Sequence, residues 1–271
     1  MQTIDRYLHR GDVLLRYRDE GEGPAIAFIH GWTLDLELWD PQAARMSGSM
    51  RVLRHDRRGF GKSTGRPDPA ADAGDLVALL DHALVDLAVI VGMSQGARAA
   101  LAVALQYPER VAGLVLDGPP DCLSAGETES DDELALAPFR ALVRKSGMDA
   151  FRRAWREHPL MRLHTGDPAS CSLLDRMLAR YPGADLAGPE PSITDPVDAA
   201  ALARLTVPVL IVNGSRDAPA RIAAGDRLMQ VLPRAERAWV PGAGHLANLD
   251  EPVVYDEVLR GFLRRQSRVA A

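Results

Sequence analysis

A serine flanked by glycines is the residue of this sequence whose type and setting point most directly to chemistry. It is Ser94 in the pentapeptide GMSQG (92–96), which follows the apolar run LAVIV and precedes an alanine- and leucine-rich segment that favours a helix. Ser94 is therefore predicted to lie where a strand turns into a helix, with Gly92 and Gly96 required because a Cβ at either position would crowd the backbone. In that position a serine acts either as a nucleophile or as the N-cap of the helix, and the local sequence fits both roles.

A serine hydroxyl attacks only when a base takes its proton, and seven histidines compete for that role. Two of them, His30 and His245, remain when those in polar or insertion segments are set aside. His245 lies in the glycine-rich segment PGAGHLANLDEP, between the last predicted strand and the last predicted helix. A loop at the carboxyl edge of a sheet favours His245 as the base, against the alternative of a turn histidine bonded to the backbone.

Two aspartates compete for the acid that orients the histidine. Asp217 in PVLIVNGSRDAPAR follows one apolar run, and Asp117 in LVLDGPP ends another. Asp217 is the first choice, with capping of the next helix as its alternative role, and Asp117 is the second choice. The chain order Ser94, Asp217, His245 is the one expected when such a triad is built on an open parallel sheet.

The elements that must position these residues are short apolar runs that alternate with helix-like segments. Several runs lack polar alternation, as expected of strands covered on both faces. The predicted strands are residues 13–19, 25–31, 51–56, 87–94, 113–118, 208–214 and 237–242. The predicted helices are residues 71–83, 95–107, 221–232 and 252–265. This order predicts an α/β fold with a mostly parallel central sheet flanked by helices.

One long insertion interrupts this alternation. Residues 121–205 contain no convincing strand, and their periodic apolar stretches are typical of amphipathic helices. We therefore predict a core made of residues 1–120 and 206–271, with the insertion as a helical cap. The cap is expected over the carboxyl ends of the strands, because ligands bind there in sheets of this kind.

Composition and charge narrow the class of partner. Of the 271 residues, 46% are hydrophobic and 25% are charged, and the net charge of −5 gives no basic patch. We expect a small-molecule substrate, and neither nucleic acid nor a membrane as a partner. No run approaches the roughly 20 apolar residues of a membrane span, and charges interrupt the first segment, so no secretory signal is expected. Cys122 and Cys171 stand outside metal-ligand spacings and are expected to be reduced thiols in a cytoplasmic protein.

Five motifs in order resemble those of the α/β-hydrolase superfamily, in its group of small cap-bearing serine hydrolases that includes 3-oxoadipate enol-lactonases and related carboxylesterases. The matching segments are FIHGW (28–32), DRRGFGKS (56–63), VGMSQG (91–96), NGSRD (213–217) and PGAGHLANLDEP (241–252). Together they extend over about residues 25 to 263, with the cap outside the match. The resemblance implies the α/β-hydrolase fold, with Ser94 as nucleophile, His245 as general base and then acid, and Asp217 as the acid that holds the imidazole.

The resemblance also implies where developing negative charge is stabilised. It assigns an oxyanion hole to the backbone N–H groups of Trp32 and Gln95, the second of which directly follows the nucleophile. His30 then has a structural role, which is to fix the loop at Gly31. No metal and no organic cofactor are implied.

A serine triad with an oxyanion hole implies acyl transfer to water, so the expected substrate is a small carboxylic ester or lactone. Two other functions remain open. The first is a C–C bond hydrolase or lyase acting on a carboxylate-bearing substrate, because Arg98 lies one turn after Ser94 and resembles an arginine of the menaquinone-pathway lyase of the superfamily. The second is a ligand receptor that retains the triad. Trp155 of the cap is a further candidate for substrate binding, and the sequence does not define the oligomeric state.

Overall fold

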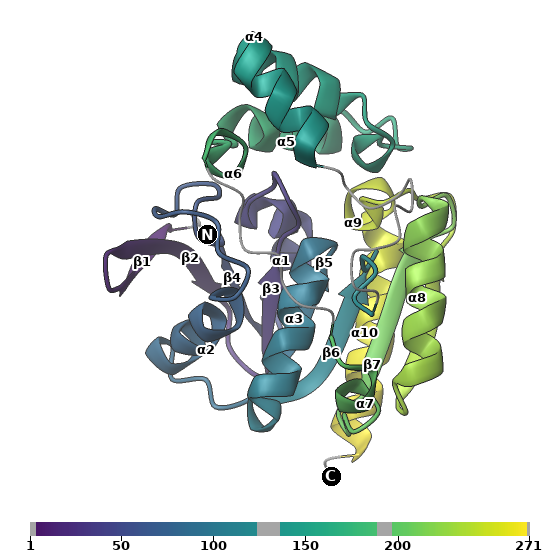
Figure 1. The fold of residues 1–271 in the computed structure, drawn as a ribbon. Coiled ribbons are helices and arrows are strands. Elements are labelled where there is room, and N and C mark those ends of the chain that lie inside the picture. Colours follow the sequence, from purple (N-terminus) through teal and green to yellow (C-terminus); the bar gives the residue numbers. More distant parts are fainter. Residues whose placement is uncertain (1–3, 124–135, 189–196, 270–271) are drawn as a thin grey trace.

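The computed structural model describes residues 4–123, 136–188 and 197–269. Within these ranges the centre of the molecule is an eight-stranded sheet with the order β1-β2-β4-β3-β5-β6-β7-β8 (Figure 1). The first two strands form an antiparallel hairpin, β2 also pairs antiparallel with β4, and every pair from β4 to β8 is parallel. The predicted mostly parallel sheet is therefore confirmed.

The strands lie close to the predicted positions. They are β1 (Arg6–Arg10), β2 (Val13–Glu20), β3 (Ala25–Ile29), β4 (Arg51–His55), β5 (Ala88–Met93), β6 (Val111–Asp117), β7 (Val209–Gly214) and β8 (Ala235–Val240). Every residue of β5 and β7 is buried, as strands covered on both faces require. The sequence predictions missed β1, whose residues RYLHR are mostly exposed at the edge of the sheet.

Helices cover both faces of the sheet, and alternate residues of β3 show which core each face forms. Ile26 and Phe28 pack on one face with side chains of the helices α1 and α10, whereas Ala27 and Ile29 pack on the other with those of α2, α3 and α8. The helices are η1 (Leu36–Trp39), α1 (Asp40–Met46), α2 (Asp72–His82), α3 (Gln95–Gln106), η2 (Pro108–Arg110), α8 (Pro219–Val231), α9 (Ala247–Asp250) and α10 (Pro252–Val269). The four predicted core helices are present, and α1 was not predicted.

The described part of the insertion forms helices that lie at two different places in the molecule. They are α4 (Leu136–Arg156), η3 (Pro159–Met161), α5 (Pro168–Arg180), α6 (Ala184–Ala187) and α7 (Ala199–Leu202). In Figure 1 α4, α5 and α6 lie at the top of the molecule, whereas α7 lies near the bottom. Leu202 is buried among the core residues of the sheet, so α7 packs with the core and not with the other three helices. The division into core and cap stays a prediction.

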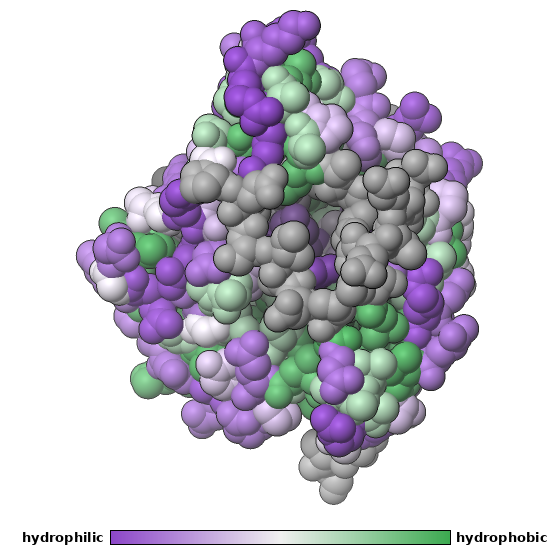
Figure 2. Space-filling view, in the orientation of Figure 1, coloured by the Kyte–Doolittle hydropathy of each residue, from purple (hydrophilic) through white to green (hydrophobic). Residues whose placement is uncertain are grey.

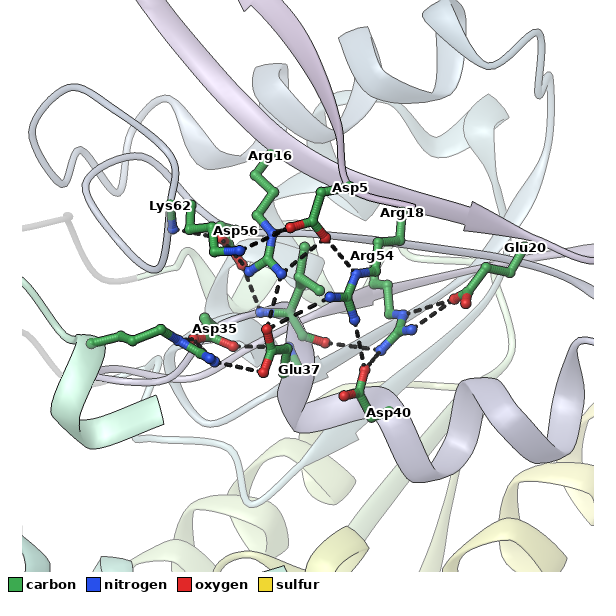
Figure 3. A network of polar contacts seen from close by, with 12 residues as sticks. Asp5, Arg16, Arg18, Glu20, Asp35, Glu37, Asp40, Arg54, Asp56 and Lys62 are labelled. Carbon is green, nitrogen blue, oxygen red and sulfur yellow. Dashed lines mark hydrogen bonds and ion pairs between the residues drawn. The ribbon is translucent and has the colours of Figure 1, made fainter. Parts of the chain in front are cut away.

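Buried charges join the antiparallel edge of the sheet to the segment that follows β3 (Figure 3). Arg16 of β2 is fully buried, and its guanidinium lies 2.8 Å from Asp5, 2.9 Å from Glu37 and 3.3 Å from Asp56. A buried cation has to be paired in this way, because burial without a partner carries a large desolvation cost. The network fixes the course of η1 and thereby of the loop that connects it to β3.

Figure 2 shows hydrophilic side chains over the core and the cap alike. In the part of the chain that the structure describes, no helix combines the length and the apolar character that crossing a membrane requires.

Candidate active site

Ser94 occupies a strained turn between β5 and α3. Its backbone has φ 54° and ψ −120°, a conformation that residues other than glycine rarely adopt. The Ser94 N–H donates to the carbonyl oxygen of Asp117 at 2.8 Å, which ties the turn to the end of β6. Among the described residues the Ser94 side chain makes no capping hydrogen bond to α3. The structure therefore gives no support to the N-cap role that the sequence left open.

The two glycines of the pentapeptide allow this turn. A Cβ on Gly92 would overlap the carbonyl oxygen of Gly96. A Cβ on Gly96 would overlap the carbonyl oxygen of Ile29 and lie 2.8 Å from that of His30. Both obstacles are backbone atoms, so neither moves aside easily, and glycine is required at both positions.

His245 and Asp217 lie together although 28 positions separate them. Asp217 follows β7 and His245 follows β8, and the distance from His245 Nδ1 to Asp217 Oδ1 is 2.9 Å. Both side chains are almost completely buried. An ionised carboxylate only accepts, so Nδ1 carries the proton and Nε2 keeps a lone pair. Nε2 is buried and has no hydrogen-bond partner within the described ranges.

Three donors keep Asp217 ionised. Burial by itself would raise its pKa, but His245 and the other two donors together hold the pKa of Asp217 below its ordinary value. The other donors are Asn213 Nδ2 on Oδ2 and the Ala218 N–H on Oδ1, each at 2.8 Å. The sequence predictions did not single out Asn213, although a polar residue near the end of the buried run VLIVNG was a usable signal.

Asp117, the second candidate acid, does not contact His245. Its Oδ2 accepts a hydrogen bond from the Tyr255 hydroxyl of α10 at 2.9 Å. Burial raises the pKa of Asp117 well above its usual range, and the charge of Asp217 adds to this effect. Both effects favour the protonated form of Asp117. The structure brings Asp217, and not Asp117, to the imidazole.

His30 holds the loop that follows β3. Its Nε2 accepts from the Arg57 N–H at 2.9 Å, so Nδ1 carries the proton and donates to the Gly31 carbonyl oxygen at 2.8 Å. Burial, together with the charge of Arg57, lowers the pKa of His30 well below its ordinary value. His30 is thus a neutral structural residue, in agreement with the role predicted for it.

The loop after His30 lies against the serine turn. A Cβ on Gly31 would lie 3.3 Å from the Ser94 Cβ and 2.8 Å from the Met93 sulfur, so a larger residue would require these neighbours to shift. Trp32 and Gln95 come from the two neighbouring segments and line the same cavity as Ser94. Within the described part of the chain, no acceptor is found for the backbone N–H of either residue.

A cavity of about 740 Å³ brings these groups together, a size typical of small-molecule sites. Ser94 and His245 line it, as do Arg98 and Trp155, the two candidate substrate contacts. Arg98 is half-buried and donates to the Asp121 carbonyl oxygen at 2.8 Å.

Two further residues in the wall of the cavity, Trp155 and Arg221, bear on what a substrate could contact there. Trp155 is buried, and its indole N–H donates to Thr33 Oγ1 at 2.7 Å, so its polar atom already has a protein partner. Arg221 of α8, which sequence reasoning missed, is buried and lines the same cavity. Arg221 stands at the start of the predicted helix 221–232, and nothing in the neighbouring residues indicated that its side chain would reach the site.

Comparison with known proteins identifies the family. The model of the family described as "Alpha/beta hydrolase family" matches residues 26–258. The chain belongs to the alpha/beta hydrolase family. The predicted resemblance, the fold class and the assignment to hydrolase enzymes are thereby confirmed.

Relatives of this alpha/beta hydrolase extend over almost its whole length. A putative 2-succinyl-6-hydroxy-2,4-cyclohexadiene-1-carboxylate synthase of Bacillus subtilis is 26% identical, with 92% of this chain and 95% of the relative covered. The 3-oxoadipate enol-lactonase 2 of Acinetobacter baylyi is 24% identical, with 94% of each chain covered. A thermophilic esterase from Thermogutta terrifontis, solved with malate bound, shares the fold with a TM-score of 0.79 at 24% identity, and 98% of this chain and 99% of that one are covered.

Proposed function

We propose that this alpha/beta hydrolase cleaves a small carboxylic ester or lactone through an acyl-serine intermediate. The observation that carries the proposal is the pair formed by His245 and Asp217, which leaves the buried Nε2 of His245 with a free lone pair. Ser94 lines the same cavity, and its hydroxyl is not used to cap α3. A base, an orienting acid and an uncommitted hydroxyl are the three parts that activate a serine.

In the first half of the proposed reaction, the Ser94 oxygen attacks the carbonyl carbon and its proton passes to His245 Nε2. Asp217 remains ionised and stabilises the imidazolium. The carbonyl oxygen becomes an oxyanion, which accepts hydrogen bonds from the N–H groups of Trp32 and Gln95. When the tetrahedral intermediate collapses, the bond to the alcohol breaks, and the alcohol leaves with the proton from His245.

In the second half, water replaces the alcohol. His245 takes a proton from water as the water oxygen attacks the acyl carbon, and it returns that proton to Ser94 as the carboxylic acid is released. For a lactone the departing alcohol remains part of the product, which is a hydroxy acid or its keto tautomer. The names of the relatives support this substrate class, since they include an enol-lactonase and an esterase.

The test uses p-nitrophenyl acetate and p-nitrophenyl butyrate with the wild-type protein and Ser94→Ala. We expect turnover by the wild type, covalent labelling of Ser94 by a fluorophosphonate, and loss of both in the variant. If the wild type shows neither turnover nor labelling, the proposal is wrong. Labelling of Ser94 with very slow turnover and retained product would instead favour a ligand receptor that keeps the triad.

A second candidate is cleavage of a C–C bond, or a lyase reaction, on a carboxylate-bearing substrate. The observation that favours it is the presence of two arginine side chains, Arg98 and Arg221, in the wall of the cavity that contains Ser94. Guanidinium groups bind carboxylates well in a partly buried setting. The name of one relative, a putative carboxylate synthase, describes a protein whose product carries a carboxylate.

Two substrates that differ in charge test this candidate. Arg98→Ala is compared with the wild type on monomethyl succinate, an anionic ester, and on the neutral p-nitrophenyl butyrate. We expect the variant to lose activity on the anionic ester and to keep most of it on the neutral one. An equal loss on both would count against recognition of a carboxylate by Arg98.

A further inference from the structure

The loop that carries Trp32 contains a second strained residue. Thr33 directly follows Trp32, is buried, and has φ 64°. For a β-branched residue this conformation is unusual, and it persists only where surrounding contacts hold it. The loop lies between β3 and η1, so strand pairing and helix bonds do not supply those contacts.

One of the contacts comes from α4, more than a hundred positions away in the sequence. The indole N–H of Trp155 donates to Thr33 Oγ1 at 2.7 Å. The Trp155 ring also packs edge-on against the Trp32 ring, with 4.8 Å between their centroids and an interplanar angle of 70°. Trp155 therefore fixes both the strained residue and the side chain of the residue before it.

Two other elements of the insertion bond to the same loop. Asp185 of α6 accepts a hydrogen bond from the Trp32 indole N–H at 2.6 Å. Arg180 of α5 donates to Asp35 Oδ2 at 2.7 Å. Figure 3 shows Asp35 beside Glu37 at the start of η1, next to the buried charge network. The loop is thus bonded at three positions to α4, α5 and α6.

We propose that α4, α5 and α6 hold the Trp32 N–H in place for the oxyanion, and that Trp155, through its hydrogen bond to Thr33, is a positioning residue and not a substrate contact. This inference rests on the proposed function, because it concerns the oxyanion hole of the acyl transfer. Donors stabilise developing charge effectively only when they are oriented before the reaction. A shift of the loop by a fraction of an ångström reduces that stabilisation without closing the cavity.

The test compares Trp155→Phe with Trp39→Phe. Both substitutions replace a buried indole by a smaller ring, but the Trp39 indole N–H has no acceptor among the described residues. With p-nitrophenyl butyrate we expect Trp155→Phe to lower kcat about tenfold while KM changes less than about twofold. Trp39→Phe should change both by less than about twofold.

A transition-state analogue supplies an independent measurement. An alkyl trifluoromethyl ketone adds to the serine and forms an oxyanion, so its affinity should fall in Trp155→Phe by about the same factor as kcat. Thr33→Val removes the other partner of the hydrogen bond and should also lower kcat. The double variant Thr33→Val/Trp155→Phe should lose little more than either single variant, because the two changes remove one shared bond.

Several outcomes would overturn the inference. A raised KM with unchanged kcat in Trp155→Phe would mark Trp155 as a substrate contact. Equal losses in Trp155→Phe and Trp39→Phe, or fully additive effects of Thr33→Val and Trp155→Phe, would show a general packing role. Urea unfolding of each variant identifies losses that come from global destabilisation. Failure of the proposed function is recognised separately: either the wild type would show neither turnover nor fluorophosphonate labelling, or Ser94→Ala would keep the turnover of the wild type.

Discussion

Replacing Asp217 by asparagine keeps the volume of the side chain but removes its charge and one acceptor. In the structure Oδ1 accepts from His245 Nδ1 at 2.9 Å and from the Ala218 N–H at 2.8 Å, while Oδ2 accepts from Asn213 at 2.8 Å. An amide has only one oxygen. If it faces His245, its NH₂ group opposes the NH₂ of Asn213. If it is reversed, its NH₂ meets Nδ1, which must then accept, and the imidazole is left with its proton on Nε2, where Ser94 needs a lone pair.

The size of the expected loss in kcat follows from the two interactions with Asp217 that the His245 imidazolium loses in the variant. Two unit charges about 4 Å apart attract each other by about 4 kcal/mol at an effective dielectric constant of about 20. A hydrogen bond to a charged group contributes about 1.5–3 kcal/mol. The charge attraction alone corresponds to about 10³-fold in rate, and adding the lower limit for the hydrogen bond gives about 10⁴-fold, so Asp217→Asn is expected to lower kcat by roughly 10³- to 10⁴-fold with little change in KM.

Asp117→Asn is the matched control, because Asp117 lies at the end of the neighbouring strand β6 and is just as buried. Burial raises the pKa of Asp117 well above its usual range, which favours its protonated form, and an amide has the same charge as that form. The amide oxygen still accepts from Tyr255, which donates to Asp117 Oδ2 at 2.9 Å. We expect kcat within about threefold of the wild type.

The assay is steady-state hydrolysis of p-nitrophenyl butyrate at pH 8, with urea unfolding curves for both variants. The reasoning is refuted if Asp217→Asn remains active while Asp117→Asn loses activity by a hundredfold or more. Equal small effects of both substitutions would show that His245 needs no orienting acid.

Two further predictions concern stability. Gly96→Ala places a Cβ against the Ile29 carbonyl oxygen and should lower the free energy of unfolding, measured in urea, by about 2 kcal/mol or more. In the control Gly48→Ala a Cβ meets nothing within 4 Å, so the free energy of unfolding should change by less than about 0.5 kcal/mol. Similar values for both variants would contradict the close approach at Gly96. Burial raises the pKa of Asp256 to about 6, although Arg45 lies 3.5 Å away. The folded state therefore binds the proton more tightly than the unfolded state, and stability declines as pH rises from about 4 to about 6. Asp256→Asn should therefore raise the free energy of unfolding at pH 8 by about 1 kcal/mol after allowance for solvent screening. This gain in stability should shrink as the pH is lowered towards 4. A gain that does not depend on pH would be inconsistent with a buried charge at Asp256.

The elements that sequence reasoning missed share a physical reason. β1 is an exposed edge strand of charged and polar residues, so it has neither the apolar run nor the alternation that indicates a strand. α1 is only seven residues long, which is too short for a helical period to stand out. Within α4 the chain departs from helical geometry at Gly147, which has φ 78°.

In the active site, too, features set by neighbouring residues were predictable from the sequence, whereas contacts between distant residues were not. Ser94 and its two glycines were predictable because the demands of a tight turn are met by neighbouring residues. The sequence ranked Asp217 ahead of Asp117, but it could not show which of them reaches the histidine. Asp117 ends a buried strand and Asp217 follows one, and only the packing of the loops after β7 and β8 brings Asp217 to His245. Asn213 was missed for a similar reason, because its role depends on its hydrogen bond to the Asp217 carboxylate, which only the folded chain brings within reach.

The sequence by itself determined the order of strands and helices, the sharp turn at Ser94, and membership of the α/β-hydrolase fold, because apolar runs, glycine positions and short motifs are properties of contiguous residues. Only the tertiary structure decided which aspartate lies within hydrogen-bond distance of His245, and what the indole N–H of Trp155 bonds to. Trp155 and Thr33 are 122 positions apart, and their contact depends on how α4 packs over the sheet. Such packing is set by the summed burial of many side chains, which no single stretch of the sequence contains.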